Sequence, residues 1–111
     1  MITTHVLDLS SGRPAAGVRV TLTRTDESAR APMGSGMTDA DGRLRDLVPN
    51  TTPLRPGAYE LMFETGAYFR ALGITAFHPR VAVTFEVSDA AQHYHVPLLV
   101  SPFGYTSYRG S

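Results

Sequence analysis

Hydrophobic and polar residues alternate along much of the chain. The alternation is clearest in the segments 17–24, 58–64 and 80–87, whose apolar residues would share one face of a strand: Val18, Val20, Leu22, Tyr59, Leu61, Phe63, Val81, Val83, Phe85 and Val87. A period of two, carried by β-branched and aromatic residues, predicts half-buried strands. The same reasoning predicts strands in 2–9 (ITTHVLDL) and 93–100 (HYHVPLLV).

Glycine and proline separate these segments in SGRP, DADG, RPG and FHPR, which are typical of turns and loops. One segment, GAYFRALG at 66–73, is predicted as a helix of about two turns, with glycines suited to its ends. About eight strands and one short helix indicate an all-β antiparallel sandwich of roughly immunoglobulin size. We expect residues 1–111 to form a single domain.

Pro97 lies inside the last strongly apolar segment. Proline has no N–H to donate to a ladder, so it favours an edge strand or a bulge. An exposed edge with the sequence VPLLV promotes aggregation unless something covers it. We therefore expect a partner subunit at this strand, with a bulge or a crossing loop as the alternative.

Composition excludes several classes of protein. With 42% hydrophobic residues the chain is expected to be globular, and a formal net charge of zero argues against nucleic-acid binding. The absence of cysteine excludes disulfides and thiol chemistry. Because no signal-like start or apolar run of about 20 residues is present, we expect a cytoplasmic protein with no membrane contact. Its small core favours oligomerisation.

Histidines are the first candidates for chemistry. His93 and His95 are two residues apart on a predicted strand, so both should project from one face, and His5 lies in the first predicted strand. Two imidazoles on one face suit a metal site. They equally suit acid–base catalysis, because imidazole titrates near neutral pH. A polar sheet face with no function is a third interpretation, and the spacing does not choose among them.

The segment TDADGR, at 38–43, contains Asp-x-Asp-Gly. A calcium loop with Gly42 at its sixth position would need acidic residues where Met37 and Val48 stand, so it is excluded. An Asp-Gly turn leading into a strand that begins at Arg43 fits better. Such an arginine is either solvated or directed at an anionic ligand. The sequence contains no nucleophile elbow, phosphate-binding glycine loop or His-Glu-x-x-His motif.

Four segments resemble the transthyretin family in the same order: HVLDLSSGRPAAGVRVTL from His5, TDADGR, YELMFETGAYF and HYHVPLLVSPFGYTSYRGS. The likeness extends from Ile2 to Ser111. The ending Tyr-Arg-Gly-Ser resembles the branch that hydrolyses 5-hydroxyisourate in purine catabolism, and not the hormone carriers. The polar segment 25–36 lacks the tryptophan common in that loop, but it lies away from the matched positions.

The resemblance implies an eight-stranded sandwich with one short helix, a homotetramer with its sites in a channel between dimers, and no cofactor or metal. It assigns catalysis to His5, Arg43 and His95. It assigns substrate binding to His5 and Arg43 and to the tail residues Tyr108, Arg109, Gly110 and Ser111, with His93 as a possible addition. The terminal carboxylate of Ser111 is expected to pair with Arg43 or Arg109, or to orient a histidine.

The implied reaction is hydrolysis of the N1–C6 amide of 5-hydroxyisourate to 2-oxo-4-hydroxy-4-carboxy-5-ureidoimidazoline. A neutral histidine would activate water, and Arg43 would stabilise the oxyanion. The sequence does not decide whether His5 or His95 is the base. Two other functions stay open: a transthyretin-like carrier of a flat aromatic ligand, and a zinc protein that uses His5, His93 and His95.

Overall fold

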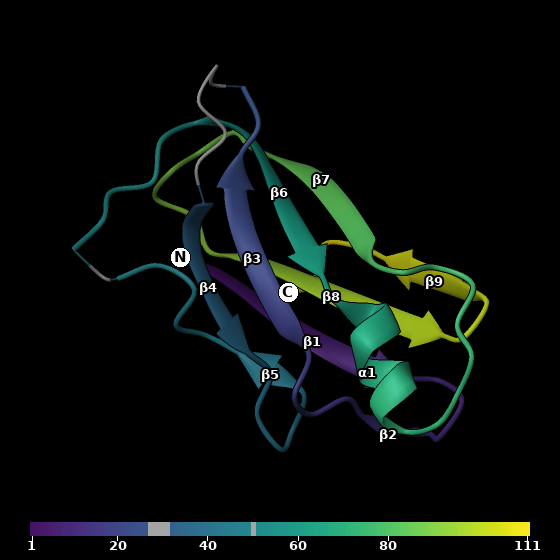
Figure 1. The fold of residues 1–111 in the computed structure, drawn as a ribbon. Helices are drawn as coiled ribbons and strands as arrows, with labels where there is room; N and C mark the ends of the chain where they lie inside the picture. Colours follow the sequence, from purple (N-terminus) through teal and green to yellow (C-terminus); the bar gives the residue numbers. More distant parts are fainter. Residues whose placement is uncertain (27–31, 50) are drawn as a thin grey trace.

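The computed structural model describes residues 1–26, 32–49 and 51–111, which form two facing β-sheets and one short helix (Figure 1). The first sheet has the order β2-β1-β8-β9, with β5 also paired to β1: β1 (Ile2–Asp8), β2 (Arg13–Pro14), β5 (Arg43–Leu44), β8 (Tyr94–Ser101) and β9 (Gly104–Ser107). The second has the order β4-β3-β6-β7: β3 (Arg19–Arg24), β4 (Pro32–Met37), β6 (Gly57–Phe63) and β7 (Val81–Val87). The helix α1 (Thr65–Ala71) follows β6. The predicted sandwich with one helix is confirmed.

The core lies between the two sheets and includes most of the residues that the alternation singled out, although Val83 and Phe85 are partly buried. Tyr59, Leu61 and Phe63 of β6 are fully buried, and β3 contributes Val20 and Leu22. Burial of each such side chain stabilises the fold by about 1.5–3 kcal/mol relative to exposure. The period of two therefore places one face of each strand against the opposite sheet.

The pairing of β1 with β8 is parallel, whereas the other strand pairs in the described parts of the chain are antiparallel. This register places Thr3 beside His95 and His5 beside Pro97. Side chains of β1 alternate, and Thr4 and Val6 belong to the buried core side. Thr3 and His5 consequently share the outer face of the sheet with His95.

The prediction that Pro97 lies on an edge strand is wrong, because β8 runs between β1 and β9. The missing N–H is accommodated on the side of β9, where the regular ladder ends at Leu98 and Ser107. The hydroxyl of Ser107 donates to the carbonyl oxygen of Pro97 at 2.8 Å. Pairing resumes as a bridge between His95 and Gly110. Pro97 thus interrupts a ladder within the sheet.

The sequence pattern did not predict β4, whose residues are rich in glycine and do not alternate between apolar and polar. A Cβ at Gly34 would overlap the carbonyl oxygen of Leu47, and a Cβ at Gly36 would lie 2.9 Å from a methyl carbon of Leu44. Glycine is therefore required because the chain of 44–47 packs directly on this strand. The rest of the polar segment discussed above includes residues 27–31, which lie outside the described residues.

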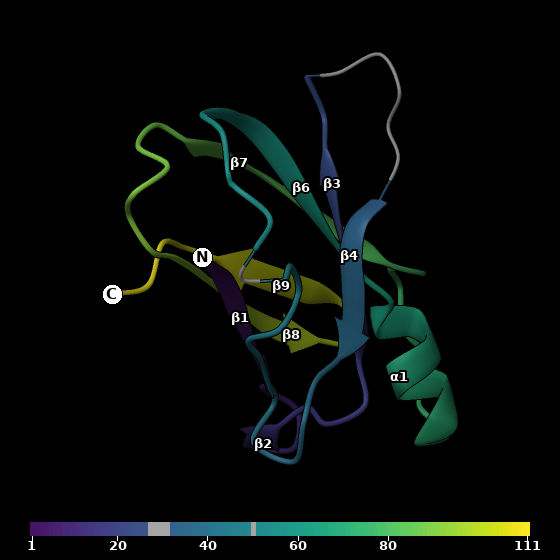
Figure 2. The same cartoon turned by 90° about the vertical axis from the view of Figure 1, so that its left-hand side faces the viewer.

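The helix is attached to β1 by a partly buried hydrogen bond. The Tyr68 hydroxyl donates to Oδ2 of Asp8 at 2.8 Å, and the backbone amide of Ser10 donates to Oδ1 at 2.9 Å. Figure 2 shows α1 on the far side of the molecule from the two chain ends, which lie close together. No helix in the described parts of the chain is long and apolar enough to cross a membrane.

Candidate active site

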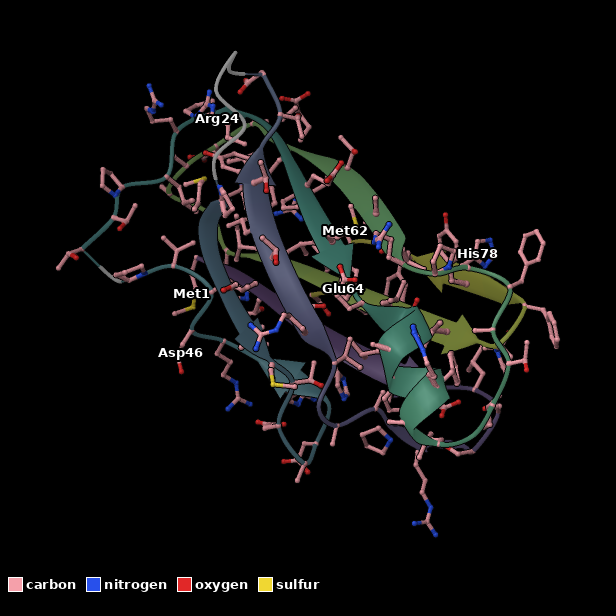
Figure 3. All side chains as sticks on the ribbon, viewed as in Figure 1. Met1, Arg24, Asp46, Met62, Glu64 and His78 are labelled. Atoms are coloured by element: carbon pink, nitrogen blue, oxygen red, sulfur yellow. The ribbon has the colours of Figure 1, made fainter. Side chains whose placement is uncertain are left out.

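The two chain ends meet at a cavity of about 290 Å³ beside the first residues of β1 and β8. Its lining combines both termini with arginine, histidine and threonine side chains: Met1, Thr3, Thr4, Arg43, Arg45, His93, His95 and Ser111. Met1 and His78 lie on opposite sides of the molecule in Figure 3, so His78 is remote from this cavity. His78 instead makes edge-to-face contacts with Phe77 and Tyr105.

His93 and His95 share one face, as their spacing predicted. Their rings are nearly parallel, at 15°, with centroids 6.5 Å apart. The Thr3 hydroxyl lies between them, 3.0 Å from Nε2 of His93 and 2.8 Å from Nδ1 of His95. Both imidazoles are thus held from the neighbouring strand, and Nε2 is the ring nitrogen that His95 can offer to the cavity.

The surroundings of His95 favour its neutral form. Burial lowers the pKa of His95 below its usual value of 6.5, and the charges of Arg43, His5 and His93 lower it further. The imidazolium form is disfavoured both by partial loss of water and by nearby positive charge. A neutral imidazole is the form that accepts a proton, so His95 is suited to act as a base at neutral pH.

His5 lies opposite Arg43 in the pairing of β1 with β5. Its Nε2 is 2.8 Å from the backbone carbonyl oxygen of Asp41. A carbonyl oxygen only accepts, so Nε2 carries the proton and donates it. This bond fixes the ring on the turn before β5 and leaves Nδ1 as the nitrogen with a lone pair in the neutral form.

The Asp-Gly turn predicted before Arg43 is confirmed. Gly42 has φ of 75°, and its carbonyl oxygen accepts from the amide of Val6 at 2.7 Å. Oδ1 of Asp39 accepts from the amides of Asp41 and Arg43, both at 2.9 Å. The bond from Arg43 is the main reason that the pKa of Asp39 lies below its usual value. The turn thereby positions Arg43 at the cavity.

The tail residues divide into two pairs. The Gly110 amide donates to the His95 carbonyl oxygen at 2.8 Å, and Ser111 lines the cavity. Tyr108 and Arg109 instead line a separate hollow of about 320 Å³ between β7 and β9. The Arg109 guanidinium lies 4.3 Å from the centre of the Tyr94 ring. A single chain therefore brings half of the tail motif to the cavity.

A zinc site of His5, His93 and His95 was an open alternative from the sequence. Among the described residues, no group of three histidine, cysteine, aspartate or glutamate side chains is arranged to hold a metal ion. The Thr3 hydroxyl occupies the position between His93 and His95 that a shared ion would need. In this structure both imidazoles are hydrogen-bonded to Thr3.

Sequence reasoning missed four cavity residues: Met1, Thr3, Thr4 and Arg45. Two of these, Thr3 and Arg45, are related to predicted site residues by spacing. Both carry the signal that was used for the histidine pair, since Thr3 is two residues before His5 and Arg45 is two residues after Arg43. On strands, that spacing places side chains on one face. A threonine and an arginine are common on exposed strand faces, so the spacing gave no reason to single them out.

The arrangement can be compared with known proteins. The family model described as HIUase/Transthyretin family matches residues 2–110. A curated 5-hydroxyisourate hydrolase from Caulobacter vibrioides is 47% identical over 114 residues, covering 99% of this chain and 97% of the relative. The chain belongs to the HIUase/transthyretin family.

Two solved structures, one from each branch of the family, have nearly the same fold as this chain. The 5-hydroxyisourate hydrolase of Klebsiella pneumoniae gives a TM-score of 0.84 at 37% identity, covering 99% of this chain and 92% of that one. Transthyretin from Sparus aurata gives a TM-score of 0.89 at 31% identity, covering 98% and 95%. The backbone is therefore shared by both branches, and sequence identity places this chain in the 5-hydroxyisourate hydrolase branch.

Proposed function

We propose that this chain hydrolyses 5-hydroxyisourate at its N1–C6 amide, yielding 2-oxo-4-hydroxy-4-carboxy-5-ureidoimidazoline in the breakdown of urate. The observation that carries the proposal is the joint placement of His95 and Arg43 at one cavity, with His5 paired opposite Arg43. The curated relative from Caulobacter vibrioides, named for this activity, supports it at 47% identity.

A histidine of the cavity removes a proton from water, and the resulting hydroxide attacks C6. His95 is suited to this step because burial and nearby positive charge lower its pKa and keep the ring neutral. Arg43 lies at the same cavity and offers N–H donors to the oxyanion that forms at C6. A single positioned donor of this kind commonly contributes a factor of about 10²–10³ in rate.

The cavity also suits the ring that must be held. Arg43 and Arg45 present positive charge to an electron-rich, oxygen-bearing heterocycle. Ser111 adds a hydroxyl and the terminal carboxylate at the same lining. The substrate-binding roles of Tyr108 and Arg109 stay predictions, because within one chain both residues line the neighbouring hollow.

A homotetramer, with the cavity at the contact between dimers, is part of the proposal. The cavity lies on the outer face of a sheet, so a second subunit is needed to exclude water from it. The edge strands β7 and β9 lie on one side of the sandwich, as Figure 1 shows. Phe77 and Phe103 are 72% and 73% exposed, which favours burial against another copy. A cytoplasmic location stays a prediction.

The carrier alternative shares the fold, so the site must discriminate between the two. A pocket for a flat aromatic hormone is expected to be mostly apolar. This cavity instead combines two arginines and two histidines, which favours chemistry over storage. The residue that favours the enzyme is His95, whose pKa is lowered by burial and by the charge of Arg43.

The test uses freshly generated 5-hydroxyisourate in large excess over protein treated with a chelator. The proposal predicts that absorbance of the substrate disappears faster than in a control without protein, over many turnovers. A carrier would consume at most one equivalent per site. Loss of activity on chelation, restored by zinc, would instead support the metal alternative. Light scattering of the same sample tests the tetramer.

A further inference from the structure

We propose that Thr3 is a positioning residue that fixes the tautomer of His95. In this arrangement Nδ1–H of His95 donates to Oγ1 of Thr3, and the Thr3 hydroxyl donates to Nε2 of His93. His95 then presents an unprotonated Nε2 to the cavity. The inference rests on the proposed function for its catalytic meaning, but the hydrogen-bond chain can be tested without it.

The geometry defines a three-member chain. Thr3 Oγ1 lies 2.8 Å from Nδ1 of His95 and 3.0 Å from Nε2 of His93, both within hydrogen-bond range. Thr3 is 6% exposed, so the neighbouring strand holds its hydroxyl in place with little access to water. The parallel register sets Thr3 directly beside His95, which makes this contact a consequence of strand pairing.

A hydroxyl carries one hydrogen, so the chain has a direction. In the first direction His95 donates to Thr3, whose hydroxyl donates to His93 or accepts from it as well; in the second, Thr3 donates to His95 and accepts from His93. The first direction leaves a lone pair on Nε2 of His95, and the second places a proton there. These two states are chemically opposite, because the first can accept a proton from water and the second cannot.

The charges around the cavity favour the first direction. Arg43 and Arg45 line it with positive charge. His5 lies nearby from β1, and its imidazole contributes to the environment of His95 when it is charged. A lone pair directed into a predominantly positive cavity is more stable than an N–H directed there.

The first direction also needs no rearrangement during reaction. A water O–H bond breaks and its proton binds Nε2 of His95, while the oxygen electron pair forms the bond to C6 and the C6=O π pair moves to the carbonyl oxygen. The oxyanion then re-forms the C6=O bond as the C6–N1 bond breaks. His95 becomes imidazolium, and its Nδ1–H continues to donate to Thr3. When the C6–N1 bond breaks, the proton on Nε2 passes to N1. Thr3 therefore holds the ring ready in both protonation states.

Imidazole ¹⁵N NMR on the wild-type protein near pH 8 tests the direction without any substrate. The proposal predicts that His95 carries its proton on Nδ1 and that Nε2 has the shift of an unprotonated nitrogen. A His95 ring protonated on Nε2 would overturn it, whatever the activity. If the Nδ1–H tautomer is found and 5-hydroxyisourate is not hydrolysed, the proposed function is wrong. The hydrogen bonds from His95 to Thr3 and from Thr3 to His93 are then still supported.

Thr3→Val removes the hydroxyl at nearly constant shape, and Thr3→Ser retains it. A misplaced catalytic tautomer can cost up to about 10⁴ in kcat, so we expect Thr3→Val to lose at least about tenfold in kcat with little change in KM. Thr3→Ser should stay within about threefold. In Thr3→Val the NMR spectrum should show His95 no longer fixed as the Nδ1–H form.

Thr38→Val is the matched control, because Thr38 is a buried threonine that donates to the backbone oxygen of Ala15 at 2.6 Å and does not line the cavity. It should lower stability without changing the His95 tautomer. An unchanged tautomer and unchanged kcat in folded Thr3→Val would overturn the role of Thr3. If Thr3→Val does not fold, the tautomer of the wild-type protein still decides.

Discussion

The amide of Gly110 donates to the carbonyl oxygen of His95 at 2.8 Å, and the glycine lies directly against the imidazole ring. A Cβ at Gly110 would come within 2.6 Å of Cδ2 of His95 and 3.1 Å of Cγ of Pro97. The tail is therefore an extension of the sheet that packs on a cavity histidine. Glycine stands there because the ring occupies the space that a side chain would need.

Gly110→Ala should displace either the tail or the His95 ring by a few tenths of an ångström or more. Since small misplacements of reacting groups can cost about 10²-fold, we expect kcat/KM to fall by at least about tenfold. The melting temperature should change little, because the tail contributes little to the core. Steady-state kinetics and a thermal melt measure both effects.

Gly104→Ala is the control for that substitution, because a Cβ at Gly104 meets just the Ser101 hydroxyl oxygen, at 3.9 Å. Its kcat/KM should match the wild type. An equal loss of kcat/KM in Gly110→Ala and Gly104→Ala would show that any glycine replacement in this region lowers activity. It would contradict a specific role for the contact between Gly110 and His95.

The pH dependence of activity should report the environment of His95. Its pKa lies below the usual value of 6.5, chiefly because of burial and then because of Arg43, so the neutral base persists to lower pH than in an ordinary histidine. We expect kcat/KM to be constant near neutrality and to fall with a midpoint below 6.5. Replacement of Arg43 by Ala removes one cause and should move the midpoint upward. A downward shift in that variant would contradict the assignment.

The hydrogen bond between Tyr68 and Asp8 should stabilise the attachment of α1 to β1. Burial would raise the pKa of Asp8, but hydrogen bonds from Ser10 and Tyr68 outweigh it and lower the pKa. Tyr68→Phe should cost about 1.5–3 kcal/mol in the free energy of unfolding at pH 7, because the bond is to a charged group. Tyr105→Phe, at an exposed tyrosine, should stay within about 0.5 kcal/mol.

The sign of the pH effect on this bond follows from the lowered pKa of Asp8. The contribution is present above the unfolded-state pKa near 3.8 and is lost as the pH falls through the lower folded-state pKa. The stability difference between wild type and Tyr68→Phe should therefore shrink in acid. Urea unfolding at pH 7 and near pH 3 tests this, and a larger difference in acid would refute it.

Deletion of Tyr108–Ser111 separates catalysis from assembly. The deletion removes Gly110 from His95 and Ser111 from the cavity, so turnover should be abolished. The core residues lie elsewhere, so the melting temperature and the subunit number should be preserved. If the subunit number falls together with activity, the tail is an assembly element and its catalytic role is contradicted.

Much of the fold could be read from the sequence because buried strands impose a period of two. The alternation in β3, β6 and β7 and the helix between glycines are where the pattern placed them. The strand β4 could not be predicted, because it has no alternating apolar face. Its glycines are required by the close packing of residues 44–47 against the strand. The prediction of an edge strand at Pro97 was wrong for a related reason. The hydrogen-bond ladder of a strand inside a sheet can be interrupted at one residue.

The candidate site was predictable only in part. The resemblance supplied His5, Arg43 and His95, and the turn chemistry of Asp39 and Gly42 explains how Arg43 reaches the cavity. The contact of Thr3 with His95 depends on the register between β1 and β8. These strands lie at opposite ends of the chain and pair in parallel. The spacing of residues within one strand does not predict its register with a distant strand. The hydrogen bonds of Thr3 to His93 and His95 could therefore be found only from the structure.

The most direct test of the account compares the wild type with His95→Asn and Arg43→Ala, using excess 5-hydroxyisourate and chelator. We expect rapid decay of substrate absorbance with the wild type and a loss of at least about 10²-fold in kcat/KM for each variant, without loss of fold. His78→Asn, on the far side of the molecule, should retain activity. Wild-type decay equal to the spontaneous rate, or near-normal turnover by folded His95→Asn, would contradict the account.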